Sequence, residues 1–168
     1  MTFPRLWRGG LLVAALALIA GCSDQAPVAP SGQAGLFGSL TGLLTCNPLS
    51  YDSTSQLVGP EGGVILAGPH RLTIPSGALS DTVTITAVVP SGNVNVVRFQ
   101  PEGLQFAQPA WLSMSYANCG LVPGLLPRHI AYTNNELDIL ELIASVPNIF
   151  SRRVTGRIEH FSGYAVAW

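Results

Sequence analysis

The chain has 168 residues, of which 10% are charged and 8% aromatic, and its formal net charge is −1. Its basic side chains other than histidine are eight arginines, and lysine does not occur. The concentrated Lys and Arg of a nucleic-acid binder are therefore missing, which excludes that class, while the length suits one domain with a real core.

The first 21 residues have the pattern of a signal peptide. Arg5 and Arg8 supply a positive start, and the apolar run LLVAALALIA over 11–20 is too short to span a bilayer. An aliphatic residue and two small residues then precede Cys22, which matches a bacterial lipobox. We expect cleavage before Cys22 and attachment of lipid to its thiol. The alternative is an ordinary secretory cut that leaves Cys22 as a disulfide partner.

Lipidation would anchor the mature chain to a membrane, because buried acyl chains bind strongly to a bilayer. The expected location is the cell envelope, and the outer membrane in a Gram-negative host, since Ser23 rather than aspartate follows Cys22. Loss of the leader leaves six arginines against nine acidic residues, a net charge of −3. The membrane, reached through the lipid, is thus the first expected partner.

Two further cysteines, Cys46 and Cys119, remain once Cys22 is assigned to the lipid. Outside the cytoplasm a disulfide is the default state of such a pair. Neither cysteine has the nearby His or Cys spacing of a metal site. We therefore predict a disulfide between Cys46 and Cys119, and neither a metal nor a cofactor.

Residues 22–44 are rich in Pro, Gly, Ser and Ala and predict a tether between the lipid and a domain over 45–168. Five apolar side chains near the end of this stretch complicate the prediction. They either cover an edge of the domain or form a turn that lies on the membrane. These side chains are Leu36, Phe37, Leu40, Leu43 and Leu44.

Beyond Cys46, short β-rich runs alternate with Gly and Pro, which predicts an all-β, antiparallel β-sandwich of about nine short strands. The run TVTITAVV over 82–89 shows the alternation of a half-buried strand. Ala67-Gly68-Pro69-His70 reads as a hairpin connection, and Gly62-Gly63 and residues 75–79 read as turns. The expected runs cover 64–66, 71–74, 82–89, 94–99, 104–106, 110–116, 130–133, 137–143, 154–160 and 164–168.

The segment NELDILELIAS over 135–145 is the one place where a helix competes, because Glu and Leu favour helices. The spacing of its apolar residues does not distinguish the period of a helix from that of a strand. A strand after an Asn134-Asn135 turn is preferred, since the segment is brief and β patterns flank it.

Three blocks of the chain resemble a known family. EGGV over 61–64, RLTIPSGAL over 71–79 and PEGLQFAQPAWL over 101–112 are similar to the ZU-five domain, named for zonula occludens proteins and Unc-five netrin receptors and also found in ankyrins. The resemblance covers about 59–116 and fits poorly over 119–151. It implies a β-sandwich that serves interaction and mechanical linkage, and it names no ligand.

Near the end of the chain, His160, Phe161 and Ser162 resemble the His-Phe-Ser motif that cleaves itself between Phe and Ser in some animal proteins with this domain. There His160 would take the proton of the Ser162 hydroxyl, and the oxygen would attack the Phe161 carbonyl. The alternative is structural, with Phe161 in the core and its neighbours in local hydrogen bonds. Gly163 departs from the bulky aromatic residue of the cleaving proteins, which would relax strain.

No pattern for catalysis on a separate substrate stands out. His70, His129 and His160 lack metal-site spacing, neither serine turn is a Gly-x-Ser-x-Gly elbow, and no phosphate loop follows Gly62-Gly63. The acidic residues in the expected strands look like a solvated face rather than paired catalytic carboxylates.

The sequence therefore predicts a non-enzymatic surface lipoprotein whose sandwich binds proteins or other envelope components. The second hypothesis is autoproteolysis between Phe161 and Ser162. The third is a carbohydrate-binding module with an aromatic platform, in which Trp111 is the best exposed candidate and core packing is the commoner role. The other aromatic candidates are Tyr116, Tyr132, Tyr164 and Trp168.

Overall fold

The computed structural model describes residues 42–120 and 126–168, and all regular structure in these ranges is β-strand. The leader, Cys22 and the tether up to residue 41 lie outside the described residues. The strands are β1 (Thr45–Leu49), β2 (Asp52–Val58), β3 (Gly63–Ala67), β4 (His70–Ile74), β5 (Val83–Val89), β6 (Gly92–Val94), β7 (Val96–Gln100), β8 (Gln105–Ser115), β9 (His129–Thr133), β10 (Ile139–Ile143), β11 (Ser145–Asn148), β12 (Arg153–His160) and β13 (Gly163–Ala167).

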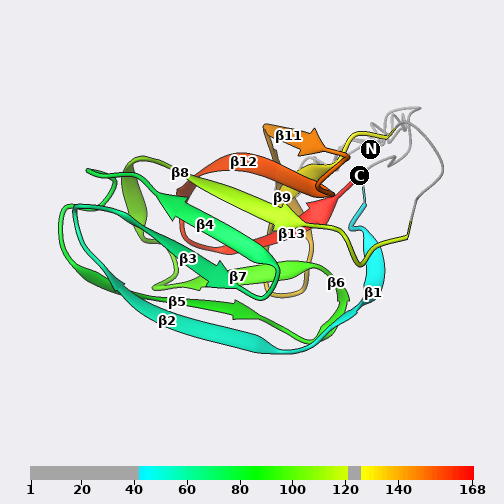
Figure 1. Ribbon diagram of the computed structural model, residues 1–168, viewed down its shortest axis with the longest axis horizontal. Helices are drawn as coiled ribbons and strands as arrows, with labels where there is room; N and C mark the ends of the chain where they lie inside the picture. Colours follow the sequence, from blue (N-terminus) through cyan, green and yellow to red (C-terminus); the bar gives the residue numbers. More distant parts are fainter. Residues whose placement is uncertain (1–41, 121–125) are drawn as a thin grey trace, which may run out of the picture. The chain divides into compact units, whose positions relative to one another are not determined.

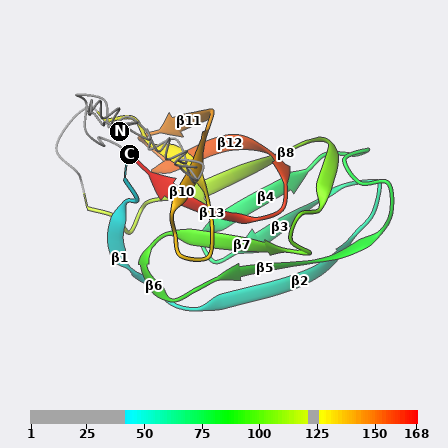
Figure 2. The same cartoon turned by 180° about the vertical axis from the view of Figure 1, so that it is seen from behind.

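The strands form two layers packed face to face, which confirms the antiparallel β-sandwich. One layer is a six-stranded sheet in the order β10-β9-β13-β7-β5-β2, and the other is a five-stranded sheet in the order β11-β12-β8-β4-β3. The five-stranded sheet is nearer the viewer in Figure 1 and the six-stranded sheet in Figure 2. A small ribbon of β1 and β6 closes one end of the sandwich.

Alternating side chains build the core between the two sheets. In β5, Ile85, Ala87 and Val89 are buried, while the alternate positions Thr84, Thr86 and Val88 are partly or fully exposed, as the TVTITAVV pattern predicts. The opposite sheet contributes buried aliphatic side chains in the same way, Leu112 from β8 and Ile158 from β12. Each sheet thus hides an apolar face that water would otherwise contact.

Nine of the thirteen strands correspond to strands expected from the sequence. The two runs at 104–106 and 110–116 join into the single long strand β8, because Pro109 is accommodated within it. The segment over 135–145 contains β10, which confirms a strand there rather than a helix. The four unpredicted strands are β1, β2, β6 and β11. They are short, contain proline or are largely polar, so alternation does not reveal them.

The predicted turns are present. Ala67 pairs with His70 at the end of the β3–β4 hairpin, with Gly68 at a φ of 50° in the connection. Gly77 takes a φ of 80° in the turn after β4. Gly62 takes a φ of 78° and lies so close to β4 that a Cβ atom would come within 2.3 Å of the Ile74 carbonyl oxygen.

The packed domain begins before the predicted boundary at residue 45. Leu44 is buried in the core, and its amide donates to the Val166 carbonyl oxygen at 2.9 Å. Gly42 exchanges two backbone hydrogen bonds with Trp168, and Leu43 bridges to Ala167. Leu43 and Leu44 therefore cover an edge of the sandwich, the first of the two roles expected for the apolar side chains near the end of the tether.

Candidate functional site

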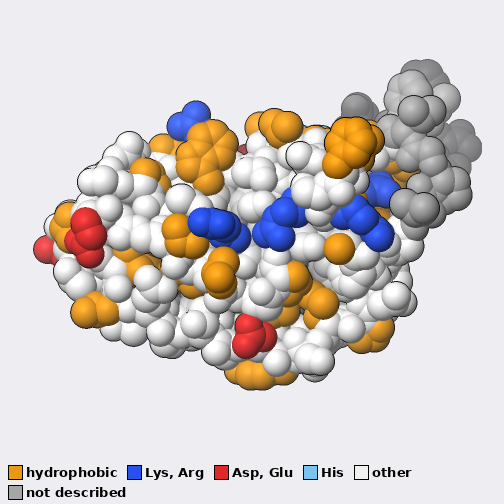
Figure 3. Space-filling model, in the orientation of Figure 1, with side chains coloured by type: hydrophobic (Ala, Val, Ile, Leu, Met, Phe, Trp, Pro, Cys, Tyr) orange, Lys and Arg blue, Asp and Glu red, His pale blue; other side chains and the backbone are white. Residues whose placement is uncertain are grey.

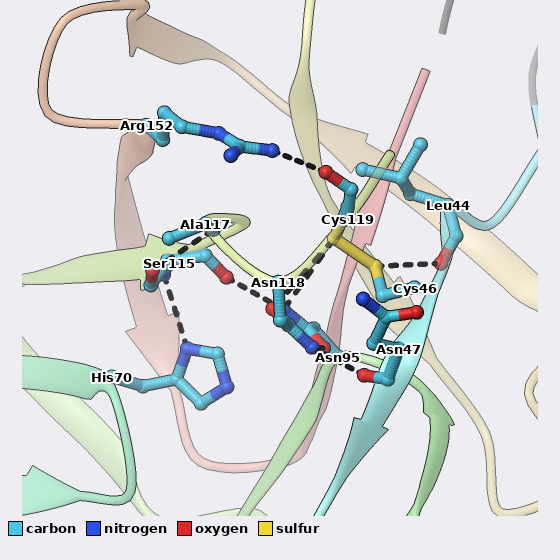
Figure 4. The surroundings of a disulfide bond; sticks show 10 residues. All are labelled: Leu44, Cys46, Asn47, His70, Asn95, Ser115, Ala117, Asn118, Cys119 and Arg152. Carbon is cyan, nitrogen blue, oxygen red and sulfur yellow. Dashed lines mark hydrogen bonds between the residues drawn. A yellow bond between two sulfur atoms is a disulfide. The ribbon is translucent and has the colours of Figure 1, made fainter. Parts of the chain in front are cut away.

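The predicted disulfide is present. Cys46 in β1 bonds to Cys119, which follows β8, and the two Cα atoms lie 3.9 Å apart. Both cysteines are buried. Figure 4 shows the bond where the start of the domain meets the loop after β8. The pair has a structural role, since it ties β1 to the loop that follows β8 in the five-stranded sheet.

Two asparagines fill the space beside the disulfide (Figure 4). The Asn95 side-chain nitrogen donates to the Ser115 carbonyl oxygen at 2.8 Å and to Asn118 Oδ1 at 2.7 Å. The Asn118 side-chain nitrogen donates in turn to the Asn47 carbonyl oxygen at 2.6 Å. Because Asn95 is fully buried, these bonds replace the water it has lost. The cluster is therefore a bracing element around the disulfide.

His70 lies buried at the start of β4, and its Nδ1 accepts a hydrogen bond from the Ser115 amide at 3.2 Å. Burial, with a smaller contribution from the charge of Arg153, lowers the pKa of His70 to about 4. The ring is neutral at pH 7, with its proton on Nε2, which has no partner among the described atoms. Residues 42–120 and 126–168 contain no group of three side chains suited to hold a metal ion.

The His160-Phe161-Ser162 segment forms the bend between β12 and β13. Phe161 is fully buried and stacks on Phe99, with ring centroids 5.3 Å apart, and meets Phe106 edge-on at 4.9 Å. The Phe161 amide donates to the Leu104 carbonyl oxygen at 2.8 Å, and its carbonyl accepts from the Gly103 amide at 2.9 Å. The bend is thus held by both packing and backbone bonds, as the structural alternative expects.

The side chains of His160 and Ser162 border different hollows. His160 lines a hollow of about 380 Å³ between the two sheets, together with Glu141, Arg157 and Glu159. Ser162 lines a much smaller one of about 60 Å³ beside β7. Within the described residues, no hydrogen bond joins the two side chains. His160 Nδ1 lies 3.5 Å from the Phe161 carbonyl oxygen, so the structure brings the histidine to the carbonyl and not to the hydroxyl.

Tyr164 fixes the backbone beside the larger hollow, which it lines together with His160. Its hydroxyl donates to the His160 carbonyl oxygen at 2.7 Å, and burial raises the pKa of Tyr164 well above its ordinary value. Tyr132 also packs edge-on against the His160 ring, with centroids 5.1 Å apart. Both tyrosines therefore serve the core rather than a surface platform.

Trp111 is the exposed aromatic residue among the five candidates for a platform. It lies on the outer face of β8 with 48% of its surface exposed, whereas Tyr116 is buried and Trp168 packs against the core. The Arg157 guanidinium lies 5.6 Å from the centroid of the indole, within the range of a cation–π contact. The expectation that Trp111 is the best exposed of the five aromatic side chains is confirmed.

Arginine, serine and threonine side chains surround Trp111 on the same face. Thr73 and Arg157 flank it on the neighbouring strands, and the next row across the sheet runs Arg71, Ser113 and Thr155. Arg153 donates from Nε to Ser113 Oγ at 3.0 Å. Figure 3 shows this face, with arginine side chains in a band across its middle and hydrophobic side chains beside them.

Sequence reasoning found Trp111 and missed its surroundings. The three arginines on this face lie at 71, 153 and 157, and they become neighbours only through the order β12-β8-β4. The same holds for the hollow beside His160, which Glu141 and Glu159 line from different sheets. No local signal marks such sets, because pairing between distant strands decides them.

Comparison of the chain with known protein families and with curated proteins finds no match. The resemblance to the ZU-five domain therefore stays a prediction. In the part of the chain that the structure describes, no helix is long and apolar enough to cross a membrane.

Proposed function

We propose that the chain is a non-enzymatic binding protein of the cell envelope, held to a membrane by lipid on Cys22 and contacting its ligand through the outer face of the five-stranded sheet. The observation that carries this proposal is the half-exposed Trp111 beneath Arg157. A large aromatic side chain left open to water, amid groups that donate hydrogen bonds, is typical of a recognition surface.

The ZU-five resemblance supports the same surface. Its three blocks occupy the turn and strand at β3, the strand and turn at β4, and β8, and these three strands are neighbours in one sheet. Blocks separated in sequence thus form one continuous part of the fold. The face that they build includes Trp111.

Binding to envelopes isolated from cells that make the protein tests the proposal. The chain from residue 22 onward with Cys22→Ser, which retains every described residue, is sedimented with these envelopes. We expect Trp111→Ala to lower the bound fraction at least fivefold. Tyr51→Ala removes an aromatic side chain that is 65% exposed elsewhere and serves as the matched control. Equal binding by all three chains would refute the role of the face.

Treatment of the envelopes separates the two ligand classes. Loss of binding after protease digestion indicates a protein ligand, whereas competition by soluble envelope polysaccharide indicates a glycan. The glycan alternative draws on the same observation, since sugars stack on exposed indole rings and bond to serine, threonine and arginine. The lipid anchor is tested separately by the mass of the mature chain extracted from membranes. We expect this mass to include the lipid, and the Cys22→Ala chain to lack that added mass.

Autoproteolysis between Phe161 and Ser162 is a second candidate, favoured by the amide of Gly103. That amide already donates to the Phe161 carbonyl oxygen at 2.9 Å, where negative charge would develop during attack. The His160 ring would have to turn from the Phe161 carbonyl oxygen, where it lies in the structure, to accept the Ser162 hydroxyl proton as the oxygen bonds to the carbonyl carbon. The C–N bond then breaks, the Ser162 nitrogen takes a proton to become a free amine, and water hydrolyses the ester.

The intact mass of the denatured protein tests this candidate. Cleavage predicts two fragments, the smaller one spanning 162–168, and their absence from Ser162→Ala. A single full-length mass after prolonged incubation at neutral pH would exclude it. Ser76→Ala is the matched control, because this exposed turn serine lies far from the bend in sequence.

A further inference from the structure

Strand β11 and the turn that follows it carry the three most exposed large hydrophobic side chains that the structure describes. Phe150 is 95% exposed and Ile149 72% exposed, and Val146 on β11 is 75% exposed. Large apolar groups left in water are costly, and neighbouring ones mark a contact surface. We call this set, Val146, Ile149 and Phe150, the apolar tip.

The apolar tip stands on a formed turn. Asn148 Oδ1 accepts hydrogen bonds from the amides of Phe150 and Ser151, at 3.1 and 3.0 Å. The Tyr116 hydroxyl donates to the Asn148 carbonyl oxygen at 3.2 Å, which fastens the turn to the end of β8. The backbone therefore holds Ile149 and Phe150 outward, where the core cannot cover them.

Positive charge accompanies the apolar tip. Residues 144–156 contain Arg152 and Arg153 and not a single Asp or Glu, although the whole chain has more acidic than basic residues. Arg128 lies in the segment before β9, which also lacks acidic residues over 126–134. Apolar side chains flanked by arginines match a surface of anionic headgroups above an acyl layer.

The apolar tip lies at the end of the sandwich where the chain enters the domain. Arg152 donates from Nη2 to the Cys119 carbonyl oxygen, and Cys119 bonds to Cys46 in β1. Figures 1 and 2 both place β11 beside the C-terminus, and Trp168 there pairs with Gly42. Cys22 precedes Gly42 by twenty residues, which can separate them by at most about 70 Å.

We propose that the apolar tip inserts into the interface of an anionic lipid bilayer while the neighbouring arginines contact its headgroups. This inference rests on the proposed lipid anchor, which would bring the same end of the domain to the membrane. The tip then fixes the orientation of the domain, and Trp111 with Arg157 stays available for the ligand. The lipid would keep the domain at the membrane, where the effective concentration of the surface favours a second, weaker contact through the tip.

Co-sedimentation with lipid vesicles tests the proposal, using the Cys22→Ser chain from residue 22 so that no acyl group contributes. The described strands and core lie within 42–120 and 126–168, all of which this chain keeps. Vesicles of phosphatidylcholine with about a third phosphatidylglycerol are compared with phosphatidylcholine alone. We expect binding to the anionic vesicles at least tenfold stronger, and weaker in high salt because salt screens the arginines.

The double variant Ile149→Ser/Phe150→Ser should lower binding to the anionic vesicles at least tenfold. Leu57→Ser/Leu66→Ser is the matched control, since these side chains are 66% and 61% exposed and lie on β2 and β3, the edge strands farthest from β10 and β11. The control should bind as the parent does. Urea unfolding of both variants checks that each retains the stability of the parent.

Three outcomes would overturn the proposal. One is equal binding by the parent and the tip variant, and another is the absence of binding to anionic vesicles. The third is a dimer in sedimentation velocity that the tip variant abolishes without any vesicle binding, which would make the tip an interface between copies. Since these chains carry no lipid, the result is independent of the mass measurement that tests acylation of Cys22.

Discussion

His70 is the buried ionisable side chain whose environment has the clearest consequence for stability. Its Nδ1 is held by the Ser115 amide, and a second proton would place a charge in the core next to the positive charge of Arg153. The folded protein therefore keeps the ring neutral down to about pH 4, whereas the unfolded chain protonates it near pH 6.5.

We predict that acid weakens the fold through His70. Because the folded-state pKa is the lower one, the stability is fully present above pH 6.5 and is lost as the pH falls toward 4, by about 3 kcal/mol in all. Urea unfolding at pH 7.5, 5.5 and 4.5 measures the slope. His70→Gln should flatten this slope, and an unchanged slope in His70→Gln would contradict the assignment.

Gly62 tests a second effect at the scale of one residue, the close approach of two backbone segments. Gly62→Ala introduces both a positive-φ alanine and a contact with the Ile74 carbonyl oxygen, so we expect a loss of more than about 2 kcal/mol. Gly103→Ala has a similar φ and nothing within 4 Å of the added Cβ, and should cost about 1 kcal/mol. Equal losses in urea unfolding would show that the close approach contributes nothing.

At the scale of elements, the disulfide joins β1 to the loop after β8 across 73 positions. Closing so long a loop restricts the unfolded chain, and on the chain-entropy estimate the loss of the bond costs about 4 kcal/mol. We predict this loss for Cys46→Ala/Cys119→Ala in urea unfolding. Reductant should destabilise the parent by a similar amount and leave the variant unchanged. A loss of stability below about 1 kcal/mol in the variant would argue against the chain-entropy explanation.

Strand prediction from sequence succeeded where one face of the strand is buried. β5 and β12 alternate apolar and polar side chains because their outer faces meet water. It failed for β2, where five of seven side chains are exposed, and for β11, which contains Pro147 on a sheet edge. Such strands are held by backbone pairing to a neighbour, which leaves little trace in their own residues.

At the scale of the whole molecule, Phe161 joins the two layers. It lies where the chain crosses from β12 in the five-stranded sheet to β13 in the six-stranded sheet. Its ring packs against Phe99 and Phe106. The bend that resembles a cleavage motif is therefore also a central piece of the core.

We predict that Phe161→Ala costs about 3–5 kcal/mol, because the surrounding rings cannot close the cavity that it leaves. Phe150→Ala changes the same residue type at a site that is 95% exposed, and should stay within about 0.5 kcal/mol of the parent. Thermal or urea unfolding of the two variants measures the difference. A small effect of Phe161→Ala would mean that the two sheets are joined by other contacts.

The sequence by itself determined the fold class, most strands, the turns at Gly62 and Gly77, and the pairing of Cys46 with Cys119. These features depend on local alternation, on backbone conformations that glycine favours, and on a simple choice among three cysteines. The predicted lipidation of Cys22 belongs to the same level, since it rests on a short local motif outside the described residues.

Only the tertiary structure decided which side chains share a surface. It placed Trp111 beside Arg157, separated the hollows of His160 and Ser162, and brought the Ile149-Phe150 turn to the end where the chain enters the domain. Each of these depends on the order and register of strands far apart in the chain. Many registers would bury the same apolar residues, and the packing of the whole sandwich selects one.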